Sequence, residues 1–80
     1  MDVTVLGPGC PKCRVVEKAV RQAVEEMGLD ANVSKVEDIR EMMKYRVALT
    51  PAVAIDGMVK IAGRIPTLEE LKRLLSEIAG

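Results

Sequence analysis

The chain begins with a strand pattern that leads directly into a helix pattern. Residues 3–6 form a short apolar run that ends at Gly7-Pro8-Gly9. From Pro11 onward, apolar residues recur at helical spacing as far as Gly28, a natural C-terminal stop. Residues 31–36 then predict a second short strand. Because a strand–helix–strand unit with parallel strands crosses over in the right-handed sense, this segment favours an α/β fold with a parallel strand pair.

The second half of the chain predicts a short helix, a hairpin and a final helix. Asp38 can cap the short helix. After Thr50-Pro51, two β-like runs flank Asp56-Gly57, a dipeptide typical of a two-residue type I′ hairpin. A Thr-x-x-Glu capping box at 67–70 precedes a leucine-rich amphipathic helix. The predicted order is β-α-β-α-β-β-α, an α/β fold with a four-stranded mixed sheet flanked by three helices, in one domain spanning residues 1–80.

The composition excludes two classes of partner. The chain has one Tyr and neither Trp nor Phe, so it lacks an aromatic platform on which nucleic-acid bases could stack. Twelve basic residues balance twelve acidic ones, so no charge excess favours a phosphate backbone. The longest apolar run, 47–55, is broken by Thr50-Pro51 and is too short to span a bilayer. We therefore expect neither nucleic acid nor a membrane as a partner.

The N-terminal residues do not follow the pattern of a secretory signal. Asp2 stands where a basic segment would lie, and Cys10 arrives before an apolar segment could fit. The sequence therefore predicts a cytoplasmic protein. In a reducing compartment, two cysteines favour chemistry or metal binding over a structural disulfide framework.

Cys10 and Cys13 are the only cysteines of the chain. A structural disulfide between them would close a very short loop and would stabilise the fold by only about 2 kcal/mol. A zinc site would be incomplete, because zinc requires four ligands and the sequence has no histidine and no third cysteine. Two thiolates alone can hold a softer ion such as Cu(I), so a soft-metal or metalloid carrier remains an alternative.

A redox-active dithiol fits the same spacing without further ligands. Cys10 stands at or just before the first helical residue, where unpaired backbone N–H groups and the helix dipole stabilise a thiolate. Cys13 follows one turn later on the same face, within reach of a disulfide. Pro11 fixes the dihedral angle that starts the helix. Lys12 and Arg14 add positive charge that favours the thiolate.

Gly7 and Gly9 precede the cysteine pair. Their conformational freedom is expected to let the chain turn sharply between the strand and the helix. The absence of side chains is also expected to leave the sulfur of Cys10 open to a partner. Gly9, Pro11 and Lys12 are therefore counted as supporting residues of the site.

The order of elements, "GCPKC" after the first strand and "TPAVAIDG" before the hairpin resemble the small thioredoxin-fold proteins, close to the glutaredoxin-sized redox-active disulfide group. The resemblance covers essentially the whole chain. It implies that Pro51 is cis and faces the disulfide, and that Thr50 presents its backbone to a substrate peptide. It also implies thiol–disulfide exchange, with a flavin-dependent disulfide reductase as a candidate electron source. The segment "AGRIPT" replaces the Gly-Gly-x-Asp-like segment of glutathione-using glutaredoxins.

The sequence therefore predicts a thiol–disulfide oxidoreductase that acts on protein disulfides. Cys10 is the expected attacking thiolate, Cys13 the resolving thiol, and Thr50 and Pro51 shape the substrate site. We expect a monomer without a cofactor. Two alternatives remain: a soft-metal or metalloid carrier that uses the same two sulfurs, and a protein-interaction module whose thiols act as a redox switch.

Overall fold

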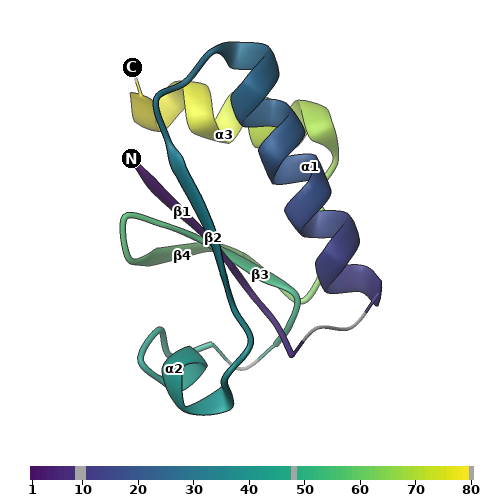
Figure 1. The fold of residues 1–80 in the computed structure, drawn as a ribbon, viewed down its shortest axis with the longest axis vertical. Helices are drawn as coiled ribbons and strands as arrows, with labels where there is room; N and C mark the ends of the chain where they lie inside the picture. The colour runs from purple at the N-terminus through teal and green to yellow at the C-terminus, as the bar shows by residue number, and fades with distance from the viewer. Residues whose placement is uncertain (9–10, 48, 80) are drawn as a thin grey trace.

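The computed structural model describes residues 1–8, 11–47 and 49–79 (Figure 1). The described residues confirm the predicted α/β class and order of elements. The elements are β1 (Asp2–Leu6), α1 (Pro11–Met27), β2 (Asn32–Val36), α2 (Ile39–Met43), β3 (Ala52–Ile55), β4 (Met58–Ala62) and α3 (Leu68–Ala79).

The four strands form one mixed sheet in the order β2-β1-β3-β4. β1 and β2 are parallel and are joined by α1, whereas β3 is antiparallel to both of its neighbours. All residues of β3 and all but the first of β1 are buried, because these central strands are covered on both faces. Figure 1 shows α1 and α3 on one side of the sheet and α2 on the other.

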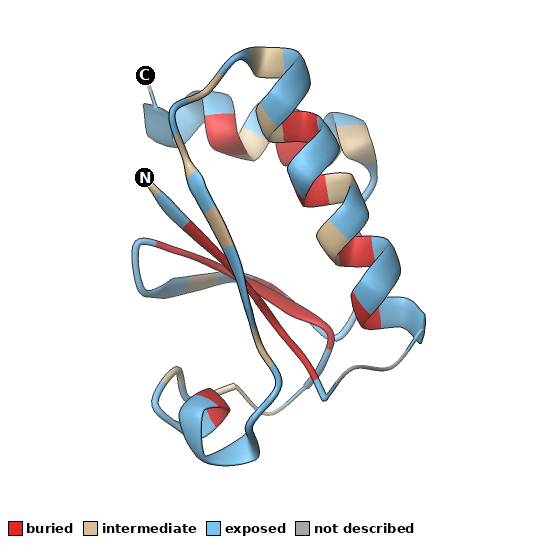
Figure 2. Ribbon diagram, in the orientation of Figure 1, coloured by how far each residue is buried: buried red, intermediate tan, exposed pale blue. Residues whose placement is uncertain are grey.

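The main core lies between the sheet and the helices α1 and α3. With no Phe or Trp in the chain, aliphatic side chains fill this space. Figure 2 shows the buried residues along the central strands and along one side of α1. The buried members of this cluster are Val3, Val5, Val16, Val20, Ala23, Val53, Ile55, Ile61, Leu71 and Leu75.

A smaller core lies on the α2 side of the sheet. Leu6, Ala52 and Ala54 form it together with Met42, the buried residue of α2. Because side chains alternate along a strand, β3 presents its two alanines to α2 and its larger residues to the main core. Met42 of α2 therefore packs against small side chains on this face.

Two turns have the geometry that the sequence predicts. α1 ends in a Schellman motif, in which Gly28 has φ 63°, its N–H donates to the carbonyl of Glu25 and the N–H of Leu29 donates to Val24. In the hairpin between β3 and β4, Asp56 and Gly57 both have positive φ, 51° and 84°, as a type I′ turn requires.

The two longer helices are amphipathic. α1 buries Cys13, Val16, Val20 and Ala23, which recur three or four residues apart. On its polar side, Glu17 and Arg21, four residues apart, form an ion pair with an N···O distance of 2.9 Å. Within the described part of the chain, none of the helices is both long and apolar enough to cross a membrane.

The packing of α3 gives the first prediction. Leu75 is 1% exposed in the main core, so Leu75→Ala should lower the free energy of unfolding by about 2–5 kcal/mol through the cavity that it leaves. Ile78 lies on the same helix but is 37% exposed, so Ile78→Ala should cost less than about 1 kcal/mol. Urea unfolding followed by circular dichroism measures both. Equal losses would contradict the packing described for α3.

Candidate active site

The structure places the second predicted cysteine on the inner face of α1. Cys13 is 6% exposed, whereas Pro11 and Lys12, which begin the helix, are exposed. Pro11 is the first helical residue, where its missing N–H leaves no helix hydrogen bond unmade. Cys10 and Gly9 lie outside the described residues. The second sulfur thus belongs to the packed side of the helix, and the residues around it define the site.

Gly7 is the closest constraint on Cys13. A Cβ atom built on Gly7 would lie 2.1 Å from the Sγ of Cys13 and 3.1 Å from its Cβ, far inside ordinary van der Waals contact. Gly7 is not among the described glycines that adopt positive φ. The expectation that Gly7 supplies conformational freedom is therefore wrong, because the position needs glycine to make room for the Cys13 sulfur.

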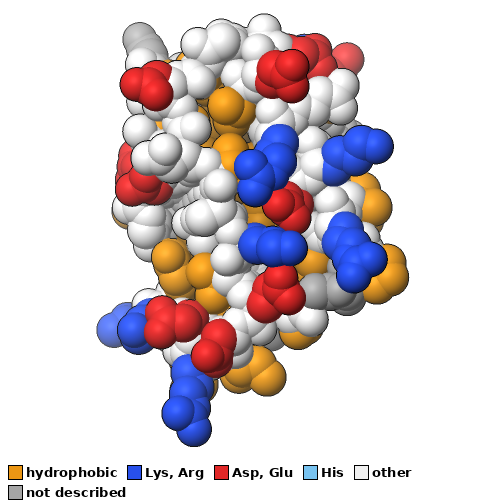
Figure 3. Space-filling view, viewed as in Figure 1, with side chains coloured by type: hydrophobic (Ala, Val, Ile, Leu, Met, Phe, Trp, Pro, Cys, Tyr) orange, Lys and Arg blue, Asp and Glu red, His pale blue; other side chains and the backbone are white. Residues whose placement is uncertain are grey.

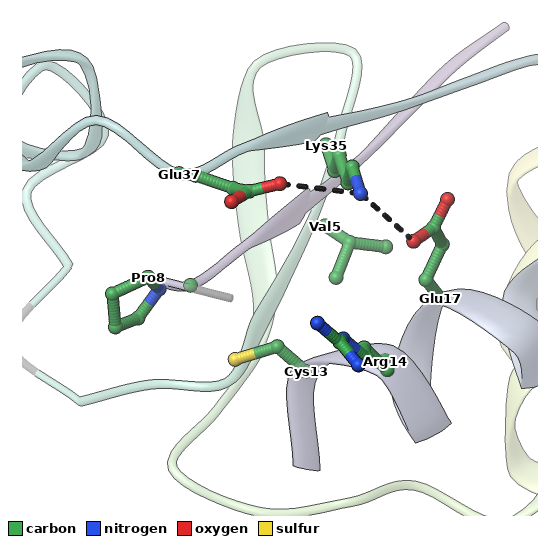
Figure 4. Close-up of a pocket in the computed structure, with 8 residues that line it drawn as sticks. Val5, Pro8, Cys13, Arg14, Glu17, Lys35 and Glu37 are labelled. Carbon is green, nitrogen blue, oxygen red and sulfur yellow. Dashed lines mark ion pairs between the residues drawn. The ribbon is translucent and has the colours of Figure 1, made fainter. Parts of the chain in front are cut away.

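A cavity of about 150 Å³ lies beside Cys13 (Figure 4). Since a water molecule takes about 30 Å³ in the liquid, the cavity has room for a few. Cys13 therefore has a water-sized space next to it although its side chain is buried. The lining residues come from β1 and the turn after it, from α1, and from β2 and the residue after it: Val5, Gly7, Pro8, Cys13, Arg14, Glu17, Lys35 and Glu37.

The charged side chains of this cavity are arranged around Lys35. Its Nζ lies 3.2 Å from a carboxylate oxygen of Glu37 and 3.8 Å from one of Glu17 (Figure 4). The sequence did not predict this cluster, because Glu17 lies on α1, far along the chain from Lys35 and Glu37. The described residues include no group of three carboxylate, thiol or imidazole side chains placed to hold a metal ion.

Thr50 and Pro51 lie at the same end of the sheet as Gly7, beyond the ends of the central strands. The antiparallel register pairs Leu6 with Ala52, so Gly7 and Pro51 come directly beyond the last pair. The Thr50–Pro51 peptide bond is cis, the isomer that the family resemblance implies. Pro51 is buried and its carbonyl accepts a hydrogen bond from the N–H of Gly63 at 2.9 Å, while Thr50 is exposed. The register thus brings the predicted substrate residues beside the strand end that contacts Cys13.

The surface around Thr50 includes apolar side chains that the sequence analysis did not single out. Leu49 is 63% exposed and lies against Gly63, where an added Cβ would come within 3.0 Å of it. Ile65, two residues further along, is 42% exposed. Contiguous exposed apolar side chains are typical of surfaces that contact partner proteins.

The Gly7–Cys13 contact gives the second prediction. Gly7→Ala should lower the free energy of unfolding by about 1–3 kcal/mol, because the new methyl group overlaps the Cys13 sulfur. In a Cys13→Ala background, which removes that sulfur, the same substitution should cost less than half as much. Urea unfolding of the four proteins completes the double-mutant cycle. An equal cost in both backgrounds would mean that the sulfur does not exclude a side chain at Gly7.

Comparison with known proteins agrees with this architecture. The sequence model of a family described as "Thioredoxin domain" matches residues 1–76. A protein of Methanothermobacter thermautotrophicus named "Thioredoxin" is 37% identical over 76 residues, which cover 95% of this chain and 99% of that protein. A protein of Methanocaldococcus jannaschii with the same name is 42% identical over 73 residues, which cover 91% of this chain and 84% of that protein. The chain therefore belongs to the thioredoxin family of thiol–disulfide oxidoreductases.

Proposed function

We propose that the protein exchanges disulfides with protein substrates through Cys10 and Cys13. The observation that carries this proposal is the burial of Cys13 against Gly7 on the inner face of α1. A sulfur in that position is shielded from a bulky protein disulfide, and it follows Cys10 by only three positions in the sequence, a spacing that a disulfide can bridge. Cys10 is therefore assigned the attack on the substrate and Cys13 the resolution, with Pro11 and Lys12 forming the start of the helix between them.

The proposed reaction has two exchange steps. The Cys10 thiolate attacks one sulfur of the substrate disulfide, which forms a mixed disulfide and releases the first substrate thiolate. Cys13 then attacks the Cys10 sulfur, the bond to the substrate breaks, and the second substrate thiolate leaves. The cavity beside Cys13 gives its proton a route to water during this step. The substrate gains two electrons, and the protein ends with a Cys10–Cys13 disulfide.

We further propose that the substrate segment lies along Thr50. Pro51 has no N–H, so it cannot donate a backbone hydrogen bond to a neighbouring strand. Thr50, which precedes it, is exposed. An extended peptide could hydrogen-bond to the Thr50 backbone in the manner of an added strand. Leu49 and Ile65 supply exposed apolar surface for the neighbouring side chains of that peptide.

The proposal includes an electron source and a compartment. The two sulfurs carry both electrons of the reaction, so the protein needs no cofactor of its own. A flavin-dependent disulfide reductase in the cytoplasm is the proposed donor that returns the Cys10–Cys13 disulfide to the dithiol, with the protein acting as a monomer.

The third prediction tests turnover. With dithiothreitol as the electron donor, the protein should speed the reduction of insulin disulfides, and Cys10→Ser or Cys13→Ser should bring the rate back to that of dithiothreitol alone. Turbidity of the released insulin B chain measures the rate. Thr67→Ser, a conservative change of the α3 cap, serves as the control and should keep full activity. Retention of Cu(I) through gel filtration by a protein that does not reduce insulin would instead support the soft-metal carrier.

The fourth prediction separates the roles of the two sulfurs. Because Cys13 is buried, iodoacetamide should alkylate Cys10 first in the reduced protein at neutral pH. Cys13→Ser should accumulate mixed disulfides with a disulfide peptide, since attack is possible and resolution is not. Mass spectrometry identifies both products. Faster alkylation of Cys13, or equal trapping by Cys10→Ser, would reverse the assignment.

A further inference from the structure

The charges of α1 are ordered against the dipole of the helix. Lys12 and Arg14 stand at its start, and Glu25 and Glu26 stand at its end. The first turn contains no acidic residue and the last turn no basic residue. A helix is stabilised by the opposite order, because its N-terminus carries partial positive charge and its C-terminus partial negative charge. The arrangement on α1 therefore does not serve the stability of the helix.

α3 of the same chain follows the favourable order at its start. Glu69 and Glu70 occupy its first turn, where carboxylates interact with the positive end of the helix. The reversed order is thus a property of the helix that follows Cys10 and carries Cys13, and not of the chain's helices in general. This contrast directs attention to what the cations at the start of α1 contact.

Ion pairs do not account for Lys12 and Arg14. Both side chains are exposed, and neither takes part in an ion pair with any of the described residues. Figure 4 shows Arg14 at the cavity beside Cys13, where Glu37 pairs with Lys35 and Glu17 pairs with Arg21 and Lys35. Other cations among the described residues also lack an ion pair. What distinguishes Lys12 and Arg14 is therefore their position at the start of α1. The other such cations are Lys18, Arg40, Arg46, Lys60 and Arg73.

The opposite end of the molecule carries acidic side chains. Asp2 begins β1, and its N–H donates to the carboxylate of Asp56 in the hairpin, at 2.8 Å. These two residues lie at the end of the sheet away from Gly7. In Figure 3, Lys and Arg side chains lie over the middle and lower part of α1 with Asp and Glu side chains among them, and further Asp and Glu side chains lie at its upper end and around α2. With a net charge of zero, the protein presents an uneven field to an approaching partner.

We propose that Lys12 and Arg14 select partner proteins whose disulfide is flanked by acidic side chains. The inference rests on the proposed function, because the partner's disulfide must reach Cys10, two residues before Lys12. The residues that flank that disulfide then pass the exposed start of α1. Carboxylates on them are attracted by the two cations, whereas lysines are repelled. Acidic partners therefore react faster, and the preference weakens as salt screens the charges.

The test uses three synthetic peptide disulfides that differ only in their flanking residues, which are Glu, Ser or Lys. The second-order rate constant for the reduced protein with each peptide is measured by rapid quenching and chromatography. At an ionic strength of about 0.01 M, the Glu peptide should react about tenfold faster than the Lys peptide, and the difference should shrink at about 0.5 M. In the double variant Lys12→Gln/Arg14→Gln, the ratio of the two rates should fall by about threefold or more. Taking the ratio cancels any general change in the reactivity of Cys10.

Two controls accompany the double variant. Arg73→Gln removes an exposed cation from α3, beside a hollow shared with Lys60 and Glu77, and should leave the ratio unchanged. The double variant should also unfold at the same temperature as the parent or a higher one, because it removes charges that oppose the helix dipole. A lost preference in a protein of undiminished stability then reports on the charges themselves.

The outcomes separate the inference from the function on which it rests. Reduction of all three peptides at equal rates, or an unchanged ratio in the double variant, would overturn the selection of acidic partners while leaving disulfide exchange intact. A ratio that falls equally in Arg73→Gln would assign the preference to overall charge and also overturn the inference. If the protein reduces none of the peptides, the proposed function fails, and the inference fails with it.

Discussion

The close approach of α1 to the end of β1 is the constraint on which the site depends. Helix and strand can come this near because residue 7 has no side chain and the sulfur of Cys13 fills the space. That contact fixes where the helix begins relative to the sheet. It also turns the sulfur of Cys13 toward the core. The position of this sulfur is therefore a result of packing between a strand and a helix, and not of the Cys-x-x-Cys segment alone.

The two faces of the sheet are covered by hydrophobic cores of different size. α1 and α3 cover one face with Val, Leu and Ile side chains, and this larger core carries most of the buried apolar surface. On the other face, the short helix α2 contributes Met42 against small side chains of β3. The thinner layer lies next to the segment that leads to Thr50. The end of the molecule that carries Thr50 is thus supported on one side by a large core and on the other by a small one.

Local patterns in the sequence predicted the elements well, because each is determined by nearby residues. The spacing of apolar residues predicted α1, and Gly28 and Asp56-Gly57 predicted the turns through the positive φ angles that they adopt. The alternation of strands and helices is then compatible with only a few strand orders in the sheet. The family resemblance supplied the cis bond before Pro51, which no local pattern could have fixed.

The parts of the site that the sequence did not predict depend on contacts between distant segments. Gly7 was expected to serve a turn, whereas its importance comes from a sulfur on the next element. The ion pairs of Lys35 connect Glu37, after β2, with Glu17 of α1, which is distant in the sequence. No residue spacing along the chain predicts this contact between β2 and α1. The contact between Leu49 and Gly63 likewise joins segments that are distant in the sequence.

The order of the strands has a consequence for how the protein behaves at high concentration. β2 and β4 are the edge strands, and their outer backbone groups could pair with a second copy of the chain. Each edge strand carries a lysine, Lys35 in β2 and Lys60 in β4, and both are exposed. Covering either charge with another strand would remove it from water at a cost in free energy. These two lysines therefore oppose aggregation through the sheet edges.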